Sequence, residues 1–164
     1  MRPEHDHPSM TEAELIREPL LRIYADLDQA VSEAGPTCRL SGRCCRFEEY
    51  GHTLFLSAIE AAVLLADAPP PSRPLDDGEH CPWQDHRGHC TARNARPLGC
   101  RVYYCEESYQ ESAVALSERF LDRLKRLTDQ LGLRWDYAPL HRHLRAALDD
   151  GRYPERDPCD QGIP

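Results

Sequence analysis

Eight cysteines carry the most specific chemical signal in this chain of 164 residues. Seven of them fall within 68 residues, in two groups that are separated by 35 residues. The first group is Cys38, Cys44 and Cys45, and the second is Cys81, Cys90, Cys100 and Cys105. Cysteine thiolates bind zinc and iron, and a metal site needs ligands that arrive from several chain segments. The two groups meet that need, so the sequence predicts a metal centre held by cysteines.

Disulfide formation is the other common use of dense cysteines, and it requires an oxidising compartment. The N-terminus has no apolar stretch behind its positive charge, and the longest apolar run covers only residues 61–66. We therefore expect no signal peptide, no membrane-spanning helix and a cytoplasmic location, where thiols stay reduced. Metal binding is then favoured over disulfides. The alternative that the cysteines are buried structural thiols stays open for the eight as a set, and it is the interpretation that we favour for Cys159.

The adjacent pair Cys44-Cys45 bears on which metal is bound. Neighbouring side chains are expected to project in different directions, so both would fit poorly around one tetrahedral zinc ion. A larger iron-sulfur cluster, with 4Fe-4S as the favoured type, or two nearby ions would use both more naturally. Two zinc ions would need about eight ligands. In that case the additional candidates are His80, His86 and His89.

Arginines flank both cysteine groups in a chain whose net charge is −8. Guanidinium groups there would offset the negative charge of a four-thiolate site and lower the pKa of nearby thiols. The alternative is that arginine is simply abundant, because the chain has a single lysine, Lys125. The flanking residues are Arg39, Arg43 and Arg46, then Arg87, Arg93, Arg96 and Arg101.

Three steps occur in order along residues 37–105: the vicinal pair Cys44-Cys45, then Cys81-Pro82 before Cys90, then Arg96-Pro97-x-x-Cys100-Arg101-x-Tyr103. This combination resembles the YkgJ-like cysteine-cluster family, a zinc- or iron-chelating domain. The resemblance implies metal chelation in a small bacterial protein. The same domain is also similar to a flagellin lysine methylase, which implies an enzymatic alternative.

The family's first block commonly reads Cys-x-x-Cys-x-x-Cys-Cys, and Ser41 stands here at the second of these cysteines. This departure lowers the rank of Cys38 as a ligand. The order in which we expect the metal ligands is Cys45, Cys81, Cys90 and Cys100, then Cys44, then Cys105 and Cys38.

Four amphipathic segments must position these loops. The spacing of apolar residues predicts helices over about residues 11–34, 57–67, 111–131 and 139–149. Ser57 and Glu60 form a capping-box pattern that opens the second helix, which places Ile59, Ala62, Val63 and Ala66 on one face. Pro19 implies that the first helix is kinked or begins near Glu18. Residues 53–56 are expected to form either a short strand or an extended entry to the second helix. We expect a disordered leader over residues 1–10 and a mobile tail over residues 151–164.

The expected fold is mainly α, a small single domain over residues 11–150 with irregular metal-bound loops and at most a minor strand pair. Only 31 of 164 residues are Leu, Ile, Val or Phe, which makes a thin core that a metal would support. The favoured function is non-enzymatic binding of an iron-sulfur cluster or zinc. The alternatives are a methyltransferase-related or redox enzyme and a metal donor. The acidic balance argues against nucleic acid or a membrane as a partner.

Overall fold

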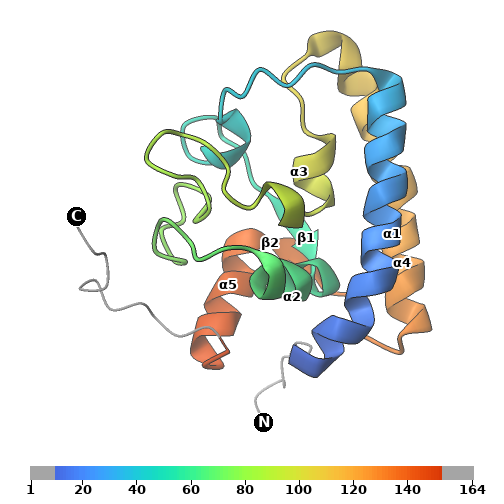
Figure 1. Cartoon of the computed structure of the whole chain (residues 1–164), viewed down its shortest axis with the longest axis vertical. Coiled ribbons are helices and arrows are strands. Elements are labelled where there is room, and N and C mark those ends of the chain that lie inside the picture. The colour runs from blue at the N-terminus through green and yellow to red at the C-terminus, as the bar shows by residue number, and fades with distance from the viewer. Residues whose placement is uncertain (1–9, 153–164) are drawn as a thin grey trace.

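The structure is a computed structural model that describes residues 10–152, and it confirms a mainly helical fold with one minor strand pair (Figure 1). The helices are α1 (Met10–Ala34), α2 (Ala58–Asp67), α3 (Leu98–Val102), α4 (Gln110–Gln130) and α5 (Leu140–Asp149). The strands are β1 (Phe55–Ser57) and β2 (Tyr137–Pro139). Expectations for the leader before residue 10, for the tail after residue 152 and for Cys159 lie outside the described residues.

Helix α1 runs without interruption through Pro19, so a start near Glu18 is wrong and the kinked alternative holds. Figure 1 shows its first turns bent away from the rest of the helix. A proline inside a helix removes one backbone hydrogen bond and crowds the preceding turn, which produces such a bend. Beyond the bend, Leu20 and Leu27 are fully buried, as the apolar periodicity predicts.

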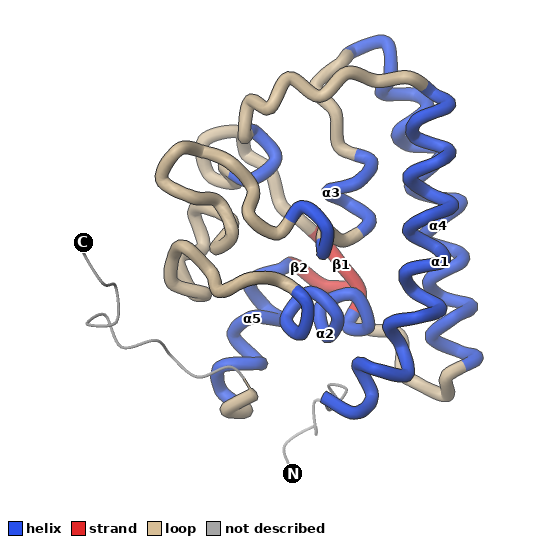
Figure 2. The backbone as a smooth tube through the Cα atoms, viewed as in Figure 1, coloured by secondary structure: helices blue, strands red, loops and turns tan. Residues whose placement is uncertain are grey.

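Helices α1 and α4 lie side by side and form one apolar core (Figures 1 and 2). The predicted stripe of α4 supplies Phe120 and Leu124, both fully buried. The helix itself begins and ends within one residue of the predicted bounds. A helix whose apolar residues recur every three or four positions must bury that face, and here α1 covers it.

Helix α2 begins with the predicted capping box, in which Ser57 and Glu60 satisfy each other's backbone N–H groups. Its buried face differs in part from the prediction, because Ala66 is exposed while Ala61 and Leu64 are buried. The reason is that α2 lies between two cores. Ile59 and Val63 belong to the core around α1, whereas Ala61 and Leu64 belong to a second core.

The two strands pair in antiparallel register, with Leu56 opposite Ala138. Strand β1 begins at Phe55, inside the segment for which the sequence left strand and extended entry open. Strand β2 has no apolar alternation long enough to be recognised. It exists because β1 offers it a partner, and the hydrogen bond from Leu140 N to Leu54 O continues the pairing at 2.8 Å.

The remaining chain forms long loops beside the helices, drawn in tan in Figure 2. These loops cover residues 35–54 and 68–97 and contain the 3₁₀ turns Arg43–Cys45 and Arg93–Ala95. They rest on the second core, where Cys45 and Cys81 pack with Trp83. The cysteine loops are thus anchored on buried apolar residues. Across residues 10–152, every helix is too short or too polar to cross a bilayer.

Candidate metal centre

Five of the seven clustered cysteines lie close together, and Cys45 is central among them. Its sulfur lies 3.9 Å from that of Cys44, and its thiol also interacts with those of Cys81 and Cys90. Cys100 is within electrostatic range of Cys44, Cys81 and Cys90. Cys45 and Cys81 are buried, and the other three are half-buried. Four separate chain segments therefore bring thiols together, as the spacing predicts.

The vicinal pair corrects one expectation, because the Cys44 and Cys45 side chains do not point apart. Gly42 adopts a left-handed conformation with φ of 69° and is followed by the tight 3₁₀ turn Arg43–Cys45. This turn directs both sulfurs to the same side of the loop, 3.9 Å apart. The backbone carbonyl of Cys45 also accepts a 2.8 Å hydrogen bond from Cys81 N, which joins the two cysteine groups.

Gln84 is a positioning residue that the sequence analysis missed. Its side chain is 1% exposed, and its Nε2 donates to Gly42 O at 3.3 Å and to Gly88 O at 3.1 Å. Gly42 precedes the vicinal pair and Gly88 precedes Cys90, so one amide group fixes the spacing of two cysteine loops. A polar residue between a buried Trp83 and a loop gives no sequence signal of its own.

Cys90 is presented by a hairpin over residues 81–91. Gln84 bridges to Cys90, Asp85 N donates to His89 O at 2.9 Å, and Thr91 N donates to Trp83 O at 2.8 Å. The buried indole of Trp83 anchors this hairpin, because its Nε1 donates to Pro69 O at 2.8 Å. The hairpin therefore brings Cys81 and Cys90 to the same side of the loop region.

Gly42→Ala is expected to disrupt this arrangement. A Cβ at residue 42 would lie 2.5 Å from Gly88 O and 2.8 Å from Gln84 Nε2, in addition to the strain of a positive φ. We expect a loss of about 2 kcal/mol or more in the free energy of unfolding, together with reduced metal content. The control is Gly51→Ala, at φ of 58° with nothing within 4 Å of its Cβ. Equal metal content in the two variants would contradict the steric role of Gly42.

Cys100 is carried by the short helix α3, which the sequence did not predict. Pro97 begins the turn, and its carbonyl accepts hydrogen bonds from Cys100 N at 3.0 Å and Arg101 N at 3.2 Å. These contacts make Arg96-Pro97 the turn that presents Cys100. Five residues are too few for a helical period to be recognised, so its place depends on contacts with α1 and α2.

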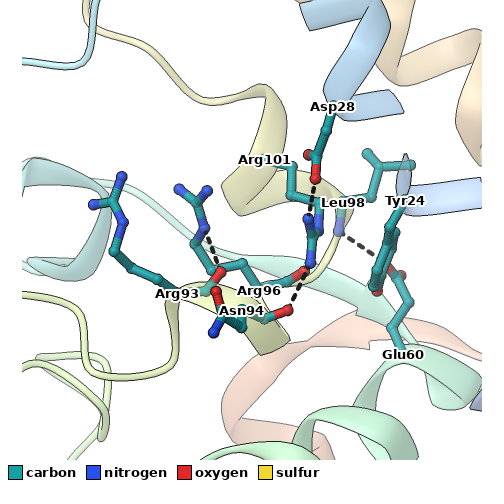
Figure 3. Close-up of polar contacts among 8 residues, drawn as sticks. All are labelled: Tyr24, Asp28, Glu60, Arg93, Asn94, Arg96, Leu98 and Arg101. Carbon is teal, nitrogen blue, oxygen red and sulfur yellow. Dashed lines mark hydrogen bonds and ion pairs between the residues drawn. The ribbon is translucent and has the colours of Figure 1, made fainter. Parts of the chain in front are cut away.

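Those contacts form one polar network, drawn in Figure 3. The Glu60 carboxylate accepts hydrogen bonds from Tyr24 Oη at 3.0 Å and from Leu98 N at 2.8 Å. Arg101 is 7% exposed and donates to Asp28 Oδ2 at 2.6 Å and to two backbone carbonyls. Arg101 is thus directed to α1 and not to the thiols, so a role for it in compensating their charge is not supported.

The thiols differ in how readily they ionise. The hydrogen bond from Cys45 lowers the pKa of Cys44 to about 7 and that of Cys90 to about 6, and the charge of Arg96 acts in the same direction. These same contacts raise the pKa of Cys45, and burial raises the pKa of Cys100. Cys44 and Cys90 are therefore the thiols that ionise most readily near neutral pH, whereas a cation must displace the protons of Cys45 and Cys100.

A cavity of about 450 Å³ opens beside the converging thiols. Six of the seven clustered cysteines line it, including the exposed residues Cys38 and Cys105. Ser41, at the position where the family has a cysteine, lies with its Oγ 3.8 Å from Cys105 Sγ. The structure therefore brings the two lowest-ranked candidates to the same cavity as the others, but outside the contacts made by Cys45.

The spread of the sulfur atoms bears on the size of the centre. In the part of the chain from residue 10 to 152, no three cysteine sulfurs lie within 4.8 Å of one another. A zinc ion with zinc–sulfur distances of about 2.3 Å places its four ligands about 3.8 Å apart. The distance of 3.9 Å between the sulfurs of Cys44 and Cys45 matches the edge of such a tetrahedron, whereas the sulfurs of the whole cysteine group are spread more widely.

The histidine candidates are separated by the fold. His89 lines the cavity, whereas His86 is exposed elsewhere on the hairpin. His80 instead faces Asp77, with Nδ1 3.6 Å from Oδ1, and Glu79 completes a group whose ligand atoms lie within 4.8 Å. The Asp77 carboxylate already accepts the backbone N–H groups of Glu79 and His80. The closeness of Asp77, Glu79 and His80 is therefore explained by the hydrogen bonds within their loop.

Comparison with known protein families, curated proteins and solved structures finds no match to this chain. The resemblance to the YkgJ-like family therefore rests on the cysteine and arginine-proline motifs alone.

Proposed function

We propose that this protein binds a thiolate-ligated metal centre, a 4Fe-4S cluster, in the loops that carry Cys44, Cys45, Cys81, Cys90 and Cys100. The observation that supports this proposal is that five thiols from four chain segments come together, with Cys45 interacting with Cys44, Cys81 and Cys90, and Cys100 within electrostatic range of the same three. Structural thiols have no reason to meet one another, because a buried thiol packs equally well against carbon. A shared ligand accounts for their meeting.

One further observation favours a cluster over one zinc ion. The sulfurs extend beyond the edge of a zinc tetrahedron. Zinc is the second candidate, supported by the 3.9 Å separation of Cys44 and Cys45. Two zinc ions that share the central Cys45 thiolate would use the same ligands.

The proposed role is metal binding without catalysis, in the cytoplasm, where the seven described cysteines would stay reduced. The alternative of a redox or methyltransferase-related enzyme is favoured by one feature, the cavity that gives small molecules access to the thiols. A metal donor is a further alternative, because the exposed Cys38 and Cys105 lie between the inner thiols and solvent.

Metal and sulfide analysis tests the proposal. Protein from iron-replete cells, purified without oxygen, is expected to be brown, with broad absorption near about 400 nm and acid-labile sulfide that is lost in air. Four irons and four sulfides per chain would support the cluster. A colourless protein with one or two zinc ions and no sulfide would replace the cluster by zinc. Protein without stoichiometric metal under either condition would overturn the metal centre itself.

A further inference from the structure

The cavity beside the thiols gathers arginines in a chain that is acidic overall. The chain has 28 acidic residues and a net charge of −8. The cavity is nevertheless lined by Arg39, Arg93, Arg96 and His89, and none of its lining residues is an aspartate or glutamate. Positive charge without a neighbouring carboxylate attracts anions, and a low-dielectric wall strengthens this attraction.

Arg93 and Arg96 have guanidinium groups that are available to a ligand. Arg96 Nε donates to Arg93 O at 3.0 Å, which fixes its stem but leaves its terminal nitrogens free of any carboxylate among residues 10–152. Figure 3 shows the two side chains extending in the same direction, away from Glu60 and Tyr24. Nearby Arg101, in contrast, is paired with Asp28 at 2.6 Å. The fold thus satisfies one arginine internally and leaves two at the cavity.

The rest of the wall is apolar and aromatic. Tyr103 and Tyr104 are half-buried and line the cavity together with Leu40. Tyr103 is held in place by its ring contact with His52, at 5.1 Å between centroids. A volume of about 450 Å³ is within the range of sites that hold small organic ligands. The cavity therefore combines a cationic end with an aromatic wall.

We propose that this cavity binds a small organic anion, whose oxyanion group lies between Arg93 and Arg96 and whose apolar part packs against Tyr103 and Tyr104. The proposal goes beyond the metal centre, because arginines near thiolates compensate their charge, but that compensation does not require an aromatic wall beside the two guanidinium groups. The shared chemistry is an oxyanion, carboxylate or phosphate, on a ring-sized apolar group. Arginine forks recognise both oxyanions.

Calorimetric titration of the purified, metal-loaded protein tests this site with defined probes. Phenyl phosphate and benzoate represent the two oxyanions, inorganic phosphate lacks the ring, and benzyl alcohol lacks the charge. We expect phenyl phosphate or benzoate to bind at least about tenfold more tightly than inorganic phosphate, and benzyl alcohol not to bind. The probe with the higher affinity identifies the preferred oxyanion. Equal affinity for benzyl alcohol, or no binding of either ring anion at millimolar concentration, would overturn the proposal.

Arg93→Gln is the decisive variant, because its guanidinium makes no contact that holds the fold in the described structure. We expect it to weaken binding of the ring anion about tenfold or more. Arg134→Gln, which removes the same charge from an exposed arginine that does not line the cavity, is expected to leave binding within about twofold. Equal weakening in both variants would show a general charge effect and contradict the site. Metal content is measured in each sample, so that loss of the centre is distinguished from loss of the anion site.

Discussion

Cys45→Ser is expected to reduce bound metal to about a tenth of the wild-type content or less. Its thiol lies 3.9 Å from that of Cys44 and interacts with those of Cys81 and Cys90, so this substitution removes the central member of the group. Even partners outside a metal's ligand set contribute 10- to 100-fold to affinity, and a ligand contributes no less. Cys90→Ser is expected to have a similar effect, because hydrogen bonding with Cys45 lowers the pKa of the Cys90 thiol to about 6. Iron, zinc and sulfide per chain are the measured quantities.

Cys38→Ser is the matched control for these variants. Cys38 lines the same cavity but is exposed and makes no contact with Cys45. Its metal content is expected to stay within about twofold of the wild type. Full metal content in Cys45→Ser and Cys90→Ser together would show that the converging thiols are not the ligands.

Glu60→Ala is expected to destabilise the fold by about 3 kcal/mol or more. The buried carboxylate accepts four hydrogen bonds, from Tyr24 Oη, Leu98 N, Ser57 N and Ser57 Oγ. Removing a buried acceptor leaves each donor unsatisfied, at a cost of about 1–3 kcal/mol for each group. The free energy of unfolding, measured by urea denaturation, checks this value. Glu33→Gln, at an exposed residue of the neighbouring helix, is expected to change stability by less than about 0.5 kcal/mol.

The pH dependence of a Glu60→Gln variant separates the charge from the hydrogen bonds. Burial raises the pKa of Glu60 in the folded state above its ordinary value of 4.5, against the lowering effect of its hydrogen bonds. A group with a raised folded pKa contributes stability that is fully present below the unfolded pKa and is lost as pH rises through the folded pKa. The free energy of unfolding of the wild type, relative to that of Glu60→Gln, is therefore expected to fall as pH rises above about 4.5. A relative stability of the wild type that increases with pH would contradict the raised pKa.

The sequence alone predicted the elements whose apolar residues recur with a helical period. The helix over 110–130 and the capping box at Ser57 and Glu60 were predicted because apolar spacing and caps are local properties of the chain. The cysteines were recognised as candidate ligands for a similar reason, since thiol chemistry belongs to the residue type. Pro19 left a kink and a start near Glu18 as alternatives, because a missing hydrogen bond permits either and packing decides between them.

Only the tertiary structure decided how the loops meet. Cys44 and Cys45 converge because Gly42 takes a left-handed turn, and Gln84 holds that turn against a hairpin some 42 residues away. Likewise, Arg101 is satisfied by Asp28 on a distant helix, whereas Arg96 keeps its terminal nitrogens at the cavity. No local spacing encodes such pairings, because they depend on which buried polar group finds its partner when the whole chain folds.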